Sequence, residues 1–318
     1  MKILITGSAG FIGFHLAQKL LKNKQYKVIG IDNLNKYYDV RIKNQRNSIL
    51  KKNKNYTFFK VDISNNKKIE KLFKKYKFDF IFHLAAQAGV RYSIDHPREY
   101  IDNNFLGFYN IIENSQKYKV KRLFYASSSS VYGENKNFPL KEKEKILPKN
   151  IYGLSKKVNE EISFIFNKFY SLKLTGLRFF TVYGEWGRPD MMIIKFISSF
   201  FKKQTFNLYN YGNHTRDFTY VGDVVEILQR LLKNNKNLKD NDVLNICSNK
   251  PIGLNDIISF LKSQNINPTV KKVSLQKADI IKTHGDNKKL KKITKFTKFS
   301  DWKDSLKKVV NWYQNEMI

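Results

Sequence analysis

The fold is decided by the stretch KILITGSAGFIG (residues 2–13), in which an apolar run enters a glycine-rich turn that opens a helix. Glycines at 7, 10 and 13 allow a tight turn, let backbone N–H groups approach a pyrophosphate and let the helix pack closely on the sheet. The next apolar run ends in Asp32, where a carboxylate can accept hydrogen bonds from ribose hydroxyls. This pattern predicts a dinucleotide site, and the carboxylate, which would repel a 2′-phosphate, favours NAD over NADP.

Short apolar runs alternate with amphipathic segments on either side of this motif. The runs cover residues 2–6, 27–31, 57–61, 79–83 and 122–126, and the helix-like segments cover residues 11–23, 65–76, 98–118 and 152–171. Such alternation predicts βαβ units and a parallel sheet. We therefore expect an α/β protein with a Rossmann-type, doubly wound parallel sheet.

The second half of the chain has a looser rhythm, in which prolines and glycines separate shorter elements. We expect an NAD-binding domain over residues 1–175 and a smaller C-terminal α/β substrate domain over 176–318, with about 220–247 returning to the first domain. Residues 301–317 predict an amphipathic terminal helix capped by Ser300 or Asp301.

The chain of 318 residues carries 59 Lys+Arg against 27 Asp+Glu, a net charge of +32. A strongly basic balance is typical of nucleic-acid binders. Here the lysines are spread along the whole sequence, which indicates a compositional bias, and a positive field also attracts anionic metabolites. We therefore expect no nucleic-acid partner.

The cysteine count and the apolar runs bear on the compartment. The single Cys247 cannot form an internal disulfide, and no uncharged apolar run approaches the ~18–20 residues that span a bilayer. The first apolar run enters the glycine turn too early for a signal peptide. We expect a cytoplasmic protein without a membrane partner. The five histidines show no metal-ligand spacing, so we expect no metal site.

Two further motifs carry chemistry. Tyr152 and Lys156, at i and i+4 near the start of a predicted helix, share a face, so the ammonium could lower the phenol pKa from its usual ~10 and create a base for an alcohol proton. Taken alone, such a pair is more often structural. The serine run 127–130 directly follows an apolar run, which places its hydroxyls at the carboxyl edge of the sheet, where ligands bind.

In this order and spacing the motifs resemble the extended short-chain dehydrogenase/reductase family of NAD-dependent nucleotide-sugar epimerases and dehydratases. The resemblance covers essentially the whole chain. It is carried by the glycine pattern, Asp32-Asn33-Leu34, Asp62-Ile63, HLAAQ (83–87), Asn103-Asn104, the serine run, Tyr152-x-x-x-Lys156 and Arg216-Asp217-Phe218. The stretches QAGVRYS (87–93) and RFFTVYGEWGRPDM (178–191) most resemble UDP-glucuronate 4-epimerases.

The resemblance implies an isomerase of polysaccharide biosynthesis that converts UDP-glucuronate to UDP-galacturonate through a transient 4-keto sugar, with tightly bound NAD. Tyr152 would be the base, Lys156 would bind the nicotinamide ribose and lower the Tyr152 pKa, and Ser128 would hydrogen-bond the sugar 4-oxygen, with the serine register open by one residue. The implied cofactor contacts are Gly7, Gly10, Phe11, Ile12, Gly13, Asp32, Asn33, Asp62, Ile63, Leu84, Ala85, Ala86, Gln87, Asn103, Ser127, Tyr152, Lys156 and Phe180.

The implied substrate contacts include an arginine for each anionic part of the sugar nucleotide. Arg216 would face the UDP pyrophosphate, and Arg188 would clamp the uronate carboxylate, because a 4-keto uronate is a β-keto acid that can lose CO₂. The full set is Arg91, Ser128, Ser129, Ser130, Thr181, Arg188, Arg216 and Asp279. The resemblance also implies a homodimer formed through the segments 98–118 and 152–171.

Several other functions remain compatible with the sequence. An epimerase acting on UDP-glucose or UDP-N-acetylglucosamine, or a UDP-glucuronate decarboxylase, would differ only in the pocket. A non-catalytic dinucleotide sensor or a basic nucleic-acid-binding protein could share the fold, because fold alone does not fix function. The intact Tyr152, Lys156 and Ser128 argue against a non-catalytic protein.

Overall fold

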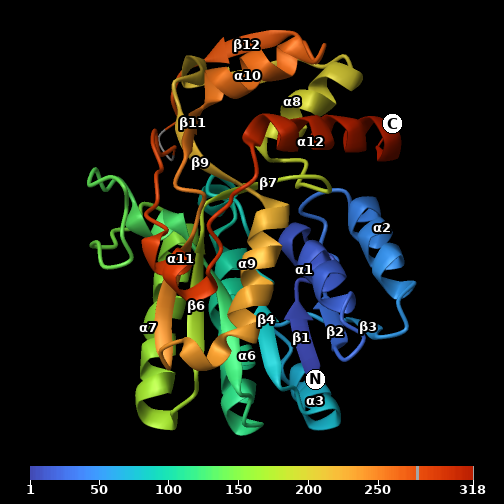
Figure 1. Ribbon diagram of the computed structural model, residues 1–318, viewed down its shortest axis with the longest axis vertical. Helices are drawn as coiled ribbons and strands as arrows, with labels where there is room; N and C mark the ends of the chain where they lie inside the picture. The colour runs from blue at the N-terminus through green and yellow to red at the C-terminus, as the bar shows by residue number, and fades with distance from the viewer. Residues whose placement is uncertain (277–278, 318) are drawn as a thin grey trace.

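The computed structural model describes residues 1–276 and 279–317 (Figure 1). Within these residues, seven strands form one parallel sheet in the order β10-β6-β5-β4-β1-β2-β3. The strands are β1 (Lys2–Thr6), β2 (Lys27–Asp32), β3 (Tyr56–Lys60), β4 (Phe80–His83), β5 (Arg122–Ser128), β6 (Leu174–Phe179) and β10 (Asn241–Ile246). The order reverses between β1 and β4, and such a switch point in a parallel sheet opens a crevice at the carboxyl ends of the strands.

Helices cover both faces of this sheet. One apolar cluster includes side chains of α1 (Phe11–Leu21), α9 (Val221–Lys233) and α11 (Lys288–Thr294), and α2 (Val40–Lys51) packs beside α1. The other cluster includes α3 (Asn66–Tyr76), α6 (Gly107–Lys117) and α7 (Ile151–Tyr170). The predicted doubly wound α/β fold is confirmed, and the strands read as continuous apolar runs because both sheet faces are buried.

Short elements follow the carboxyl ends of β4 and β5. After β4 the chain forms α4 (Tyr92–Asp95), α5 (Pro97–Tyr100) and the π-helical turn η1 (Ile101–Leu106), which continues into α6. After β5 it forms the 3₁₀ turn η2 (Ser129–Tyr132). The sequence predicts the serine run just past the strand, but β5 extends through Ser128, so the run straddles the end of β5.

The smaller part of the molecule lies beyond the carboxyl edge of the sheet, at the top of Figure 1. It contains α8 (Met192–Phe201), α10 (Leu254–Ser263) and α12 (Trp302–Glu316), which share an apolar cluster of their own. Its strands are β7 (Thr181–Tyr183), β8 (Phe206–Tyr209), β9 (Thr215–Tyr220), β11 (Pro251–Gly253) and β12 (Val270–Val273), and the 3₁₀ turn η3 covers Asn210–Gly212, while η4 (Asn235–Asn237) lies after α9.

The boundary between the two parts lies after β6. This strand pairs with both β5 and β10, so a boundary at residue 175 would cut through a strand of the large sheet. The segment 221–246 lies with that sheet, because α9 packs on α1 and β10 pairs with β6. We therefore propose that the first domain extends to Phe179 and is completed by α9 and β10.

Two helices illustrate what local sequence specifies. The N-cap of α12 is Asp301, whose side chain accepts hydrogen bonds from the backbone N–H groups of Lys303 and Asp304. In contrast, α2 has no counterpart among the predicted helices. None of the helices in the described residues is long and apolar enough to cross a membrane.

Candidate active site

Two adjoining cavities lie along the carboxyl edge of the sheet. The first, of about 390 Å³, is lined by the glycine turn after β1 and by the ends of β2, β4 and β5. The second, of about 550 Å³, extends between this edge and the smaller part of the molecule. Both are lined by Tyr37, Thr181, Arg188 and Met191, so they form one continuous cleft.

The first cavity is bounded by a tight glycine turn. The close packing of this turn requires glycine, and a backbone without side chains can approach a dinucleotide pyrophosphate. Gly7 has φ of +70°, and a Cβ on Gly13 would lie 2.1 Å from the carbonyl oxygen of Gly7. Asp32 lies at the end of β2, where its Oδ1 accepts a hydrogen bond from the backbone N–H of Leu34 at 2.8 Å. Burial raises the pKa of this carboxyl, and the positive charge of Lys43 acts in the opposite direction. These residues suit NAD.

The first cavity is lined by every predicted cofactor residue except Asp62. The carboxylate of Asp62 accepts hydrogen bonds from Asn33 Nδ2 at 2.8 Å and from the hydroxyl of Ser64 at 2.7 Å. Burial acts to raise its pKa, but these hydrogen bonds hold the pKa below its usual value. Asp62 therefore orients the cavity-lining Asn33, and its direct contact with a cofactor stays a prediction.

The predicted base, Tyr152, lies in the first turn of α7. The side chain of the N-cap residue Asn150 accepts a hydrogen bond from the N–H of Gly153 and so begins the helix at the cavity. Burial raises the pKa of the Tyr152 phenol, while a hydrogen bond with Ser128 and the charge of Arg188 act to lower it. Ser128 Oγ also accepts a hydrogen bond from the N–H of Ser130 at 3.1 Å. Tyr152 and Ser128 can therefore contact one oxygen atom.

Lys156 follows Tyr152 by one turn of α7. Its ammonium lies 5.9 Å from the centre of the Tyr152 ring, it is 2% exposed, and burial lowers its pKa to about 7. The Tyr152 pKa is shifted by burial, Ser128 and Arg188, and its expected lowering by Lys156 stays a prediction. Burial penalises the charged form of both groups, and the ammonium is only partly charged at neutral pH.

Arg188 lies in the cleft, but part of its guanidinium is already paired. Nε and Nη2 donate to the two carboxylate oxygens of Asp190 at 3.0 and 2.6 Å. Tyr37 donates its hydroxyl to the same carboxylate at 3.1 Å. Among the described residues, Nη1 makes no hydrogen bond. Only the Nη1–Nη2 edge is therefore available to a sugar carboxylate.

The second cavity gathers the remaining predicted substrate residues. Arg91 donates from Nε and Nη2 to Asp279 at 3.1 and 2.7 Å and stacks 4.1 Å from the centre of the Tyr209 ring. Arg216 lines the same cavity, and burial lowers its pKa to about 10. Two arginines and an aromatic ring in one cavity suit a nucleoside diphosphate.

Sequence reasoning missed several residues that line the cleft, among them Tyr37, Tyr38, Lys43, Asp190 and Tyr209. The first three lie in the loop and helix after β2. The sequence shows them as a cluster of polar and aromatic residues directly after Asp32. This cluster lacks the periodicity of a strand or helix, so the sequence does not indicate which of its side chains face the cleft.

The histidines and the carboxylates give no indication of a metal. His83 Nδ1 lies 2.8 Å from Thr6 Oγ1, and burial lowers the His83 pKa to about 3, which suits a packed neutral ring. In the part of the chain that the structure describes, no group of three or more His, Cys, Asp or Glu residues could hold a metal ion.

Comparisons with known proteins match this chain to one family and to several nucleotide-sugar epimerases. The model of the NAD dependent epimerase/dehydratase family matches residues 3–247. UDP-glucuronate 4-epimerase of Thermodesulfobacterium geofontis is 36% identical over 97% of this chain and 95% of that protein. The structure of UDP-glucuronic acid 4-epimerase from Bacillus cereus with UDP-glucuronic acid and NAD has a TM-score of 0.92 at 30% identity, covering 99% of both chains. UDP-glucose 4-epimerase of Thermotoga maritima with UDP-glucose gives 0.89 at 30%, covering 100% of both.

Proposed function

Because this chain belongs to the NAD-dependent epimerase/dehydratase family, we propose that it converts UDP-glucuronate to UDP-galacturonate. It is an isomerase, an NAD-dependent nucleotide-sugar 4-epimerase that acts on UDP-sugars. The proposal of an acidic sugar is carried by Arg188, whose guanidinium faces the cleft near Tyr152 with one edge free. The similarity to UDP-glucuronate 4-epimerases supports it.

Three side chains would handle the sugar 4-hydroxyl. Tyr152 Oη accepts its proton, and Ser128 Oγ holds the same oxygen by a hydrogen bond. Lys156, when protonated, places a positive charge next to the phenol and favours the phenolate. The chemistry that NAD supplies when bound is the reversible uptake of a hydride from C4 of the sugar, together with a positive charge in its oxidised form.

Inversion requires the 4-keto sugar to present its other face before the proton and the hydride are returned. The two cavities suit this requirement, because the arginines of the second cavity can hold the diphosphate while the sugar turns in the first. Tyr152 then gives its proton back to the 4-oxygen. Ser128 holds that oxygen in both orientations.

Arg188 would protect the intermediate from decarboxylation. A β-keto acid loses CO₂ when the bond to the carboxylate aligns with the π system of the ketone. Two parallel hydrogen bonds from the free Nη1–Nη2 edge would fix the carboxylate out of that alignment.

A neutral UDP-sugar is the second candidate substrate, favoured by one observation. Asp190 pairs with Arg188, so the cleft already holds a carboxylate on that guanidinium. A neutral sugar would leave this pair intact, whereas a uronate adds a second carboxylate beside it.

The variant Arg188→Ala separates these substrates. We expect kcat/KM for UDP-glucuronate to fall about 100-fold, as for loss of one partner of a desolvated ion pair, and a UDP-pentose to appear among the products. For UDP-glucose the fall should stay below about tenfold. The control Arg41→Ala removes another arginine that pairs with the aspartate two positions away, on the exposed surface, and should change neither. An equal loss on both sugars would mean that Arg188 does not bind the carboxylate.

A further inference from the structure

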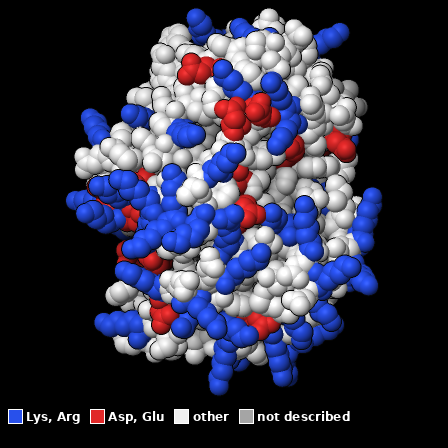
Figure 2. All heavy atoms as spheres, viewed as in Figure 1, with Lys and Arg blue, Asp and Glu red and all other residues white. Residues whose placement is uncertain are grey.

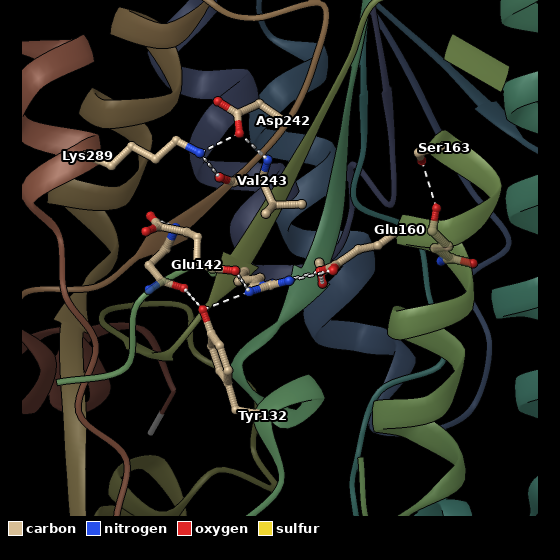
Figure 3. A network of polar contacts seen from close by, with 11 residues as sticks. Tyr132, Glu142, Glu160, Ser163, Asp242, Val243 and Lys289 are labelled. Atoms are coloured by element: carbon tan, nitrogen blue, oxygen red, sulfur yellow. Dashed lines mark hydrogen bonds and ion pairs between the residues drawn. The ribbon is translucent and has the colours of Figure 1, made fainter. Parts of the chain in front are cut away.

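A buried polar network joins β5, β6 and α7 (Figure 3). Ser127 donates from Oγ to Glu160 Oε1 at 2.6 Å. Arg178 binds the same carboxylate through Nε, at 2.9 Å from Oε1, and Nη2, at 2.7 Å from Oε2. The side chains of Glu160 and Arg178 are 8% and 4% exposed. This ion pair is therefore desolvated and its geometry is bidentate.

The network continues from Arg178 to further elements. Its Nη1 donates to the hydroxyl of Tyr132 at 2.8 Å and to the carbonyl oxygen of Glu142 at 2.9 Å. The Tyr132 hydroxyl donates to Asn245 Oδ1 at 2.7 Å. Figure 3 shows Glu160 projecting from α7 and Tyr132 at the other end of these contacts. Because the partners come from separate elements, the network fixes those elements relative to one another.

The two ends of the Ser127–Glu160 contact each adjoin a proposed catalytic group. Ser127 precedes Ser128 on β5, and Glu160 follows Lys156 by one turn of α7. Neighbouring residues of a strand point to opposite sides. Ser127 is turned to Glu160, while Ser128 hydrogen-bonds with Tyr152. One carboxylate thus links the strand that carries Ser128 to the helix that carries Tyr152 and Lys156.

We propose that Glu160, held by Arg178, is a positioning residue for the epimerisation. By accepting the hydrogen bond of Ser127 it sets the separation between the Ser128 hydroxyl and the Tyr152 phenol. The same contact favours Ser128 as the serine that binds the sugar oxygen. The hydroxyl of Ser127 is held at 2.6 Å by a buried carboxylate, whereas that of Ser128 donates over a longer distance, 3.2 Å, to the hydroxyl of Ser130. The inference rests on the roles proposed above for Ser128 and Tyr152, but not on the identity of the sugar.

The variant Ser127→Ala tests the inference without disturbing the ion pair. Glu160→Ala would leave Arg178 buried without a counter-charge and could prevent folding. For Ser127→Ala we expect kcat to fall about tenfold while KM changes less than about threefold, since the reacting groups are misplaced by a fraction of an ångström. The hydrogen bond with Ser128 lowers the Tyr152 pKa, so its weakening should move the rise of kcat to higher pH.

Two further variants complete the experiment. Ser127→Thr keeps the hydroxyl on a strand residue and should restore the kcat and the pH profile. Ser163→Ala removes another buried hydroxyl, which donates to the carbonyl oxygen of Asn159 at 2.7 Å within α7, and should behave as the unsubstituted protein. Unchanged kcat and pH profile in Ser127→Ala, or an equal loss in Ser163→Ala, would overturn the inference.

The choice of sugar keeps this result separate from the proposed substrate. Every variant is assayed with UDP-glucuronate and with UDP-glucose. If the unsubstituted protein epimerises only UDP-glucose, the proposed substrate is wrong, and the kcat and pH profile of Ser127→Ala on UDP-glucose still decide the role of Glu160.

Discussion

Tyr152 is subject to opposing influences on its pKa. Burial raises the pKa, Ser128 and Arg188 act to lower it, and the pKa stays above its ordinary value, so the phenol is protonated at neutral pH. Lys156, with a pKa near 7, contributes charge only as the pH falls. The Tyr-x-x-x-Lys pair alone therefore does not make Tyr152 a phenolate at neutral pH. The other groups around the phenol also determine its pKa.

Removing the base should stop turnover without disturbing the fold. We expect Tyr152→Phe to lower kcat by ~2 or more orders of magnitude, because general base catalysis contributes about that much. Where residual turnover is measurable, it should lose the rise with pH expected of a phenol that must be deprotonated. Tyr125→Phe alters a buried tyrosine outside the cleft and serves as control. Near-normal turnover by Tyr152→Phe in stopped assays would refute the assignment.

The residue-level features that the sequence could not predict depend on contacts across the fold. Ser127 and Glu160 are 33 positions apart, and their pairing follows from how α7 packs on β5. The pairing of Arg188 with Asp190 depends on the path of a loop. Adjacent serines look alike in a sequence, so only the structure separates Ser127 from Ser128.

At the scale of elements, local patterns predicted five of the seven strands that the described residues place in the large sheet, and not β6 or β10. The five predicted strand runs correspond to β1–β5. The inner strands are apolar because both of their faces are buried, whereas the edge strand β3 is partly exposed and is marked by its aromatic residues.

The predicted helical segments do not include α2, α8, α9, α10 or α11. Of these, α2 has the sequence VRIKNQRNSILK, whose few apolar positions give a weak helical face. It buries Lys43, Arg46 and Asn47 as well as apolar residues. A search for an apolar helix face therefore does not find it, because part of its buried face is polar.

The glycine turn connects β1 to α1. Of its three glycines, Gly13 leaves the least room for a Cβ. A Cβ there would meet the backbone of Gly7 and Ser8, so the turn and α1 must separate. We expect Gly13→Ala to cost about 1–3 kcal/mol of stability, as for an overpacked site, and to lower NAD affinity at least tenfold. Thermal unfolding and calorimetric titration with NAD measure the two effects.

A second glycine provides the comparison. Gly13 lies in the first turn of α1 and Gly253 is the N-cap of α10, but a Cβ on Gly253 would meet only the flexible side chain of Asp256. Gly253→Ala should therefore bind NAD normally. Equal NAD affinity in both variants would show that the close packing of Gly13 does not shape the cofactor site.

Over the whole molecule, charge is widely distributed. Figure 2 shows Lys and Arg across the entire visible face, with Asp and Glu interspersed and fewer. This arrangement fits the compositional bias inferred from the sequence. It attracts anionic substrates in general and does not select a UDP-sugar by itself.

Exposed apolar side chains on two neighbouring helices support the predicted homodimer. On α7 these are Phe164, Ile165, Phe169 and Tyr170, and Tyr109 on α6 is also exposed. We propose that a second copy of the chain covers them, since contiguous apolar surface marks an interface. Sedimentation should give a dimer, and Phe169→Glu should weaken it. A monomer at micromolar concentration would contradict this proposal.

The most direct test of the proposed function is the reaction itself. The purified protein is incubated with UDP-glucuronate, first without added cofactor and then with NAD⁺, alongside UDP-glucose and UDP-N-acetylglucosamine, and the products are identified by chromatography and NMR. We predict UDP-galacturonate as the main product, formed faster than either neutral epimer. Epimerisation of the neutral sugars alone, or a decarboxylated UDP-pentose as the main product, would contradict the proposal.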